Sequence, residues 1–314
     1  MTTVKAQAIP ASAERTRRHG RRQMSDKTIA QLFIWPTLII LIAMNVFPLF
    51  YSLYLSFNDY SVIANEPPQW VALENYKEIL TNERARYWHN FTVTGRYALL
   101  SVGLQIVIGF GLAMLLREKF RGSGFITTLI LIPMMLSPVV VGLFWKLIFD
   151  PSKGFFNYLI YLNPRGGDQW LSDPTLSLWS IVIVDVWMWS PFVMLLVLSG
   201  LSAIPNYLYE AAAIDRASAW FQFRRITLPQ VMPLLLIAVL FRTIEAFKAF
   251  DVVMGLTGGG PGDTTETVAV RLYSEAFLGK FNTGESGALA YIVLIIIIAI
   301  SNLYIRALNR AGGD

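Results

Sequence analysis

The chain has 314 residues, of which 54% are hydrophobic and only 15% are charged. A soluble domain carries roughly 25% charged residues, so this composition is that of a membrane protein whose apolar side chains lie in lipid. The chain has no cysteine, which excludes a disulfide framework, a thiolate metal site and a cysteine nucleophile. The net charge is +5, and the position of the positive residues decides what that charge means.

Apolar segments, taken in chain order, predict an all-α membrane protein with six transmembrane helices. A bilayer core of ~30 Å needs about 20 apolar residues per helix. Five segments meet this length, and a sixth, from Gln230 onward, has a polar face. The predicted helices cover about residues 29–56, 91–116, 123–149, 177–203, 230–256 and 286–308. Together they form a membrane domain of residues 29–308, between a basic arm of residues 1–28 and a tail of residues 309–314.

Clusters of Lys and Arg predict the side of the membrane on which each loop lies. They occur in the arm of residues 1–28, in the short loop of residues 117–122, in the segment 204–229 and in the tail. Cytoplasmic loops are enriched in these residues, so both termini are expected in the cytoplasm. The arm is therefore expected to bind anionic membrane lipid and not nucleic acid.

The sequence contains no motif for nucleotide or metal binding. No G-x-x-x-x-G-K-[ST] motif occurs, and TGGGPGD at residues 257–263 lacks the lysine and hydroxyl that hold phosphate and magnesium. The two histidines, His19 and His89, are not spaced as metal ligands. We expect the chain to bind no cofactor and no metal, and not to be an enzyme by itself.

Polar residues in the predicted fifth helix indicate either a solute pathway or an ion-paired structural seam. Arg242, Glu245, Lys248 and Asp251 alternate in sign at a spacing of three, so that neighbours can pair along a helix. A charge near the bilayer centre costs ~2.5–3.5 kcal/mol, so these side chains must pair or face protein or water. Both interpretations meet that condition.

The predicted fourth helix adds aromatic and polar groups that suit a carbohydrate. Trp187 and Trp189 lie near Asp185, inside the apolar segment and not at its edge, and an indole face matches the apolar face of a sugar ring. The candidate solute-binding residues are Trp187, Trp189, Ser190, Arg242, Glu245 and Lys248. Arg242 and Lys248 are positively charged and can bind an anionic group, so both an anionic and a neutral carbohydrate are candidate solutes.

Residues 204–229 are far more patterned than a simple connection requires. Residues 206–215 predict one short helix with Asn206 as its N-cap, and Ser218 is expected to cap a second. The segment EAAAIDRASAWFQFRRITLP resembles the EAA loop of permease subunits of bacterial binding-protein-dependent ABC importers, in particular carbohydrate permeases of the maltose-permease type. The matching residues are Glu210, Ala211, Ala212, Asp215, Ala217, Phe223, Ile226, Leu228 and Pro229.

The resemblance implies the six-helix fold of a type I ABC importer permease in the bacterial inner membrane, with cytoplasmic coupling helices in residues 204–229. It implies a second permease subunit, two ATPase subunits that use ATP and magnesium, a periplasmic binding protein and a carbohydrate solute, which includes sugars, oligosaccharides, glycosides and sugar or polyol phosphates. A stand-alone ion-coupled carrier and a membrane scaffold without transport are the alternatives.

One residue departs from the family pattern. Arg216 stands where the EAA loop has glycine. A left-handed backbone costs a non-glycine residue roughly 1–2 kcal/mol, so either Arg216 is strained or the turn is built differently.

Overall fold

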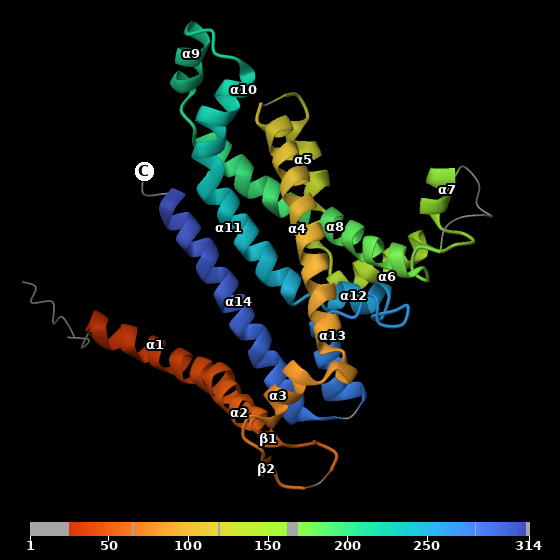
Figure 1. The fold of residues 1–314 in the computed structure, drawn as a ribbon. Coiled ribbons are helices and arrows are strands. Elements are labelled where there is room, and N and C mark those ends of the chain that lie inside the picture. The colour runs from red at the N-terminus through yellow and green to blue at the C-terminus, as the bar shows by residue number, and fades with distance from the viewer. Residues whose placement is uncertain (1–24, 65, 119, 162–168, 280, 312–314) are drawn as a thin grey trace, which may run out of the picture. The chain divides into compact units, whose positions relative to one another are not determined.

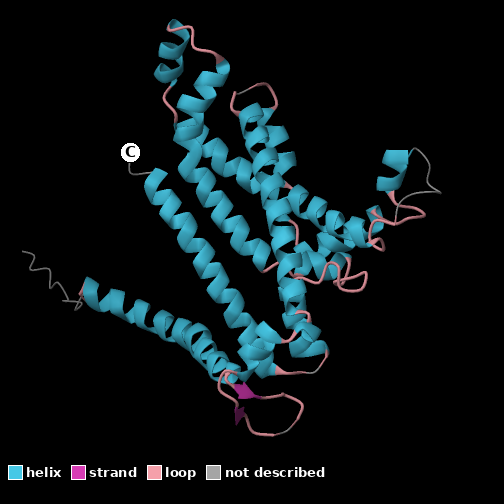
Figure 2. Ribbon diagram, in the orientation of Figure 1, coloured by secondary structure: helices cyan, strands magenta, loops and turns pink. Residues whose placement is uncertain are grey.

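The computed structural model describes residues 25–64, 66–118, 120–161, 169–279 and 281–311. Within these ranges the chain is almost entirely helical, as predicted, and the only sheet pairs β1 (Asn58–Asp59) with β2 (Gln69–Trp70) (Figure 2). The chain divides into two units, residues 1–51 and 52–314. Five helices in the described residues are long and apolar enough to cross a membrane: Ala30–Ser56, Tyr87–Leu116, Pro174–Ala203, Ala219–Phe247 and Thr283–Arg310.

The described residues of the first unit, from residue 25 onward, are almost all apolar helix. This unit contains α1 (Asp26–Leu41) and the π-helical turn η1 (Ile42–Val46), and α2 (Phe47–Ser56) continues from it into the second unit. Proline lacks a backbone N–H, and a π-helical turn is one way in which a helix accommodates the lost bond. η1 ends at Val46, two residues before Pro48.

Two long helices, α4 (Tyr87–Leu116) and α8 (Pro174–Ala203), pack along each other in the second unit (Figure 1). Gly109 allows this approach, because a β-carbon at that position would lie 2.7 Å from the carbonyl oxygen of Ser190. α11 (Leu228–Phe247) packs against both helices, and α14 (Thr283–Ala311) packs along α11. The helices predicted at 91–116 and 286–308 thus begin a few residues earlier than expected.

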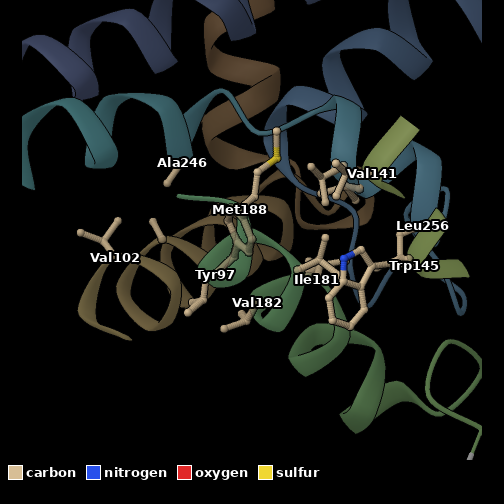
Figure 3. Close-up of a cluster of buried hydrophobic side chains, with 14 of the residues drawn as sticks. Tyr97, Val102, Val141, Trp145, Ile181, Val182, Met188, Ala246 and Leu256 are labelled. Carbon is tan, nitrogen blue, oxygen red and sulfur yellow. The ribbon is translucent and has the colours of Figure 1, made fainter. Parts of the chain in front are cut away.

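The main hydrophobic core lies where α8 meets α4 and the shorter helices. Tyr97 and Val102 come from α4, Ile181, Val182 and Met188 from α8, and all are buried (Figure 3). Trp145 and Val141 from α6 (Pro138–Ile148) and Leu256 from α12 (Asp251–Leu256) belong to the same cluster. This packing fixes the face of α8 that points toward α11, where the polar residues gather.

The segment predicted as one helix over 123–149 is broken. It forms α5 (Ser123–Leu131), the 3₁₀ turn η3 (Pro133–Met135) and α6 (Pro138–Ile148). Leu136 and Ser137 are extended, because Pro138 disfavours helical backbone in the residue before it, and Pro133 removes a further donor. The single continuous span expected here is therefore wrong.

The segment predicted as one helix over 230–256 is also interrupted. α11 ends at Phe247, and α12 (Asp251–Leu256) starts after a turn. The Thr267 hydroxyl donates to the carbonyl of Ala249 at 2.9 Å, which satisfies a backbone group in the break. α12 then packs on α6 so closely that a β-carbon on Gly142 would lie 3.1 Å from the α-carbon of Gly255. Arg242 and Asp251 consequently do not share one helix.

The remaining elements are short. Their bounds are α3 (Glu74–Thr81), η2 (Glu83–Ala85), α7 (Phe155–Tyr161), α13 (Val268–Tyr273) and η5 (Ser274–Leu278).

Candidate functional site

A buried polar cluster joins three membrane helices. Arg242 on α11 is only 3% exposed, and its Nη2 atom lies 3.3 Å from Oδ1 of Asp185 on α8. Its Nε donates to Oε1 of Gln105 on α4 at 2.8 Å, and Nε2 of Gln105 donates to Oδ2 of Asp185 at 2.7 Å. The guanidinium carbon also lies 4.5 Å from the ring centre of Trp189. The charge of Arg242 is thus matched by a carboxylate on another helix, whereas its spacing in the sequence offered Glu245 on the same helix.

Four of the six candidate solute-binding residues line one small hollow. Trp189, Arg242, Glu245 and Lys248 surround about 100 Å³ beside the break between α11 and α12. Glu245 Oε1 and Lys248 Nζ lie 2.7 Å apart, and both side chains are about half exposed. Glu245 and Lys248 are therefore open to a ligand, whereas Arg242 lies behind them.

Trp187 and Ser190 do not join this hollow. They line an apolar cavity of about 640 Å³ together with Trp145 and Pro191. The Ser190 hydroxyl is buried and donates to the carbonyl of Val186 at 2.6 Å. Successive residues of a helix point about 100° apart, so residues 187, 189 and 190 cannot all face one site.

The patterned segment 204–229 forms two short helices at one end of the second unit (Figure 1). α9 (Asn206–Ile214) is followed by α10 (Ala219–Gln222) and the π-helical turn η4 (Phe223–Thr227), which leads into α11 at Leu228 and Pro229. The Ser218 hydroxyl accepts from the Phe221 N–H at 3.2 Å, which confirms it as a cap. Asn206 is not the N-cap as expected: Pro205 holds that position, and no side chain caps the helix.

The two helices enclose an open hollow of about 530 Å³. Its lining contains five of the residues that match the EAA pattern, Ala211, Ala212, Asp215, Ala217 and Ile226, together with Leu208, Ser218 and Phe221. Glu210 is exposed beside it. Phe223 instead packs inward, edge to face on Phe110 of α4, with ring centres 5.7 Å apart. The geometry gives a small-residue hollow with acidic side chains in or beside it.

The family described as "Binding-protein-dependent transport system inner membrane component" matches residues 105–311, about two thirds of the chain, and this range includes the whole of α9, α10 and η4. The chain belongs to this family. It is accordingly a multi-pass membrane subunit and not an enzyme.

Relatives of this permease match it over nearly its whole length. It is 32% identical to the trehalose/maltose transport system permease protein MalF of Thermococcus litoralis, over 90% of this chain and 94% of that one. It is also 32% identical to the trehalose transport system permease protein SugA of Mycobacterium tuberculosis, over 100% of this chain and 99% of that one. A probable ABC transporter permease of Sinorhizobium fredii is 36% identical over 98% of this chain and 97% of that one.

Solved permeases share the fold. A subunit of a bacterial alginate ABC transporter, solved in complex with an alginate-bound periplasmic protein, superposes with a TM-score of 0.76 at 17% identity, covering 88% of this chain and 93% of that one. At this identity the likeness shows the fold alone, and that fold is the type I ABC importer permease fold expected from the EAA loop.

The permease retains the turn of the EAA loop despite its arginine. Arg216 has a φ of 53°, which is left-handed. Its N–H donates to the carbonyl of Ala213 at 3.1 Å, and the N–H of Ala217 donates to the carbonyl of Ala212 at 2.9 Å. These two bonds form the Schellman motif that ends many helices with glycine at this position. Arg216 is therefore strained, and the turn is not built differently.

Replacing Arg216 by glycine is expected to stabilise the permease by up to ~1 kcal/mol, because the relieved left-handed strain exceeds the added freedom of the unfolded chain. Arg216→Ala removes the same charge but keeps a β-carbon, so it is expected to give little gain. Thermal unfolding of the purified protein separates the two variants. Equal stability of the glycine and alanine variants would show that the left-handed backbone carries no cost here.

Proposed function

We propose that this permease is one membrane subunit of an ATP-driven importer that moves a carbohydrate into the cytoplasm by alternating access. The observation that carries the proposal is the α9–α10 hollow, which gathers Ala211, Ala212, Asp215 and Ala217 at one end of the molecule. A slim alanine surface admits close approach by another protein, and the nearby carboxylates can accept bonds from its basic groups. We assign this surface, with Glu210, to docking of an ATPase subunit.

The distribution of charge supports a cytoplasmic position for this end. Arg117 at the end of α4 contacts Tyr209 of α9, and Arg224 and Arg225 lie in η4. Lys and Arg are enriched on the cytoplasmic side of membrane proteins. Both termini are proposed to lie on that side, and the arm of residues 1–24 lies outside the described residues.

The partners follow from the same proposal. A second permease subunit completes the pathway, two ATPase subunits supply the work with ATP and magnesium, and a periplasmic binding protein delivers solute. The chain itself is proposed to bind neither nucleotide nor metal. A stand-alone ion-coupled carrier is not favoured, because relatives along the whole chain are named as transport-system permeases.

A carbohydrate is the proposed solute class. Relatives at 32% identity are named for trehalose and for trehalose/maltose transport, and one at 29% identity for starch degradation products. The hollow beside Trp189 offers an indole face together with the carboxylate of Glu245 and the ammonium of Lys248. These groups suit a hydroxylated ring whose one face is apolar. Its volume of about 100 Å³ lies below the about 300–1,000 Å³ usual for small-molecule sites, so this chain is proposed to form one wall of a shared site.

Neutralising Glu245 or Lys248 is expected to raise the KM for transport by roughly 2- to 12-fold, because each loses a hydrogen bond worth about 0.5–1.5 kcal/mol. Stability should change little, since the pair is half exposed. Glu74 and Lys77 form a matched control, another exposed i,i+3 pair, at 3.3 Å on α3. Glu74→Gln should leave KM unchanged. If Glu245→Gln and Lys248→Gln also leave KM unchanged, Glu245 and Lys248 are not in the solute site.

The solute class is tested by ATP hydrolysis in the purified assembly. The four membrane and ATPase subunits are mixed with the binding protein and with trehalose, maltose, starch oligosaccharides, alginate oligosaccharides, methionine or histidine in turn. We expect one of the carbohydrates to stimulate hydrolysis. Stimulation by an amino acid and by no carbohydrate would overturn the assignment.

A further inference from the structure

The side chain of Tyr209 contacts two other elements, one through its ring and one through its hydroxyl. The guanidinium carbon of Arg117, at the end of α4, lies 4.1 Å from the centre of its ring. Its hydroxyl lies 2.9 Å from the Thr227 hydroxyl at the end of η4. Thr227 is only 2% exposed, so this bond is shielded from water. Tyr209 thus connects α9 both to α4 and to the start of α11.

A second contact ties the other half of the coupling region to the same helix. Phe223 of η4 packs on Phe110 of α4, and Trp220 of α10 stacks on Phe223 with ring centres 5.5 Å apart. These contacts hold α10 and η4 in place without Tyr209. Besides Tyr209, α9 has Leu208 packed against the core of α4 and α8 and a buried Ala212, and both are apolar contacts. Along the chain it is joined by Ile204–Pro205 on one side and by the strained turn at Arg216 on the other.

We propose that Tyr209 is a positioning residue that makes α9 move as one body with α4 and α11, so that force applied to α9 reaches the membrane helices. The inference rests on the proposed function of α9 as an ATPase-docking helix. Without the two polar contacts of Tyr209, only the apolar contacts of Leu208 and Ala212 would hold α9, and part of an imposed displacement would be lost at its two ends. The docking surface itself would remain, since Ala211 and Asp215 face the hollow and not α4.

Distances between α9 and α4 test the positioning role without any solute. The chain has no native cysteine, so Ala213→Cys on α9 and Leu115→Cys on α4 take one spin label each, in an assembly whose other subunits lack cysteine. We expect Tyr209→Ala to broaden the measured distance distribution. Tyr209→Phe keeps the ring over Arg117 and loses only the bond to Thr227, so it should match Thr227→Val, and the double variant should be no broader than either one.

Tyr207 supplies the matched control. It lies on the same helix, is 65% exposed, and forms no hydrogen bond or ring contact among the described residues. Tyr207→Ala should leave the distance distribution unchanged. A Tyr209→Ala distribution as narrow as that of Tyr207→Ala would overturn the proposal, even if the assembly transports carbohydrate normally.

The second readout is the number of solute molecules moved per ATP hydrolysed. Tyr209→Ala removes the cation–π contact and the hydrogen bond together, and we expect it to lower this ratio roughly fivefold or more, while ATPase subunits stay bound. Tyr209→Phe should fall between Tyr209→Ala and the unaltered chain. Loss of bound ATPase subunits in Tyr209→Ala, with an unchanged ratio in Tyr209→Phe, would assign Tyr209 to the docking surface and overturn the positioning role.

Discussion

Replacing Arg242 by methionine is expected to destabilise the permease by about 3–5 kcal/mol, because it leaves the Asp185 carboxylate buried without its cation. Both side chains are almost fully enclosed, and the Gln105 amide depends on the same cluster. Thermal unfolding of the purified chain and the fraction that inserts into the membrane measure the effect.

Two further variants separate the effect of an unpaired buried charge from the effect of lost packing. Replacing the three residues by apolar groups, in Arg242→Met with Asp185→Leu and Gln105→Leu, removes both charges and the amide together and is expected to recover most of the stability. Lys248→Met deletes a charge of the same sign from the exposed pair and should change stability by at most about 1 kcal/mol. An Arg242→Met protein as stable as Lys248→Met would show that the buried pair is not required.

Placing a large side chain in the α9–α10 hollow is expected to have the largest effect on transport. Ala211 lines the hollow and is exposed, so Ala211→Trp fills it without disturbing the membrane helices. Loss of a well-packed anchoring contact costs about 2–4 kcal/mol, which corresponds to a 30- to 1,000-fold weaker association with the ATPase subunit. Copurification of the ATPase and carbohydrate-stimulated ATP hydrolysis should both fall.

Ala213→Trp is the matched control for this variant. Ala213 is exposed on the same helix but does not line the hollow. The control should retain the ATPase subunits and should show that a tryptophan on α9 is tolerated. Full ATPase retention in Ala211→Trp would exclude the hollow as the docking surface.

The helical class and most spans could be predicted because the bilayer sets a length that apolar sequence must meet. The breaks were harder to predict. Pro133 and Pro138 predict a kink, but only the structure shows that Leu136 and Ser137 leave the helix altogether. The turn after Phe247 contains neither glycine nor proline, and it is stabilised by a hydroxyl that lies eighteen residues beyond Ala249. Local sequence carries no sign of that bond.

The two candidate sites also differ in how far the sequence could predict them. The docking residues lie in one continuous segment with a recognisable pattern, so they could be found without knowledge of the fold. The cluster of Arg242, Asp185 and Gln105 draws on three helices, and the sequence indicates only that each buried polar group needs a partner. A polar glutamine within an apolar segment was the available signal for Gln105. The separation of Trp189 from Trp187 depends on helix rotation, which packing decides.

Carbohydrate uptake into proteoliposomes tests the central claim most directly. The vesicles contain this chain, the second permease and the two ATPase subunits, with ATP enclosed on the side of α9 and binding protein and labelled carbohydrate on the other. We predict uptake that requires ATP, the binding protein and both permease subunits, and that is lost with Ala211→Trp. Uptake by this chain alone, driven by an ion gradient without ATPase subunits, would contradict the account.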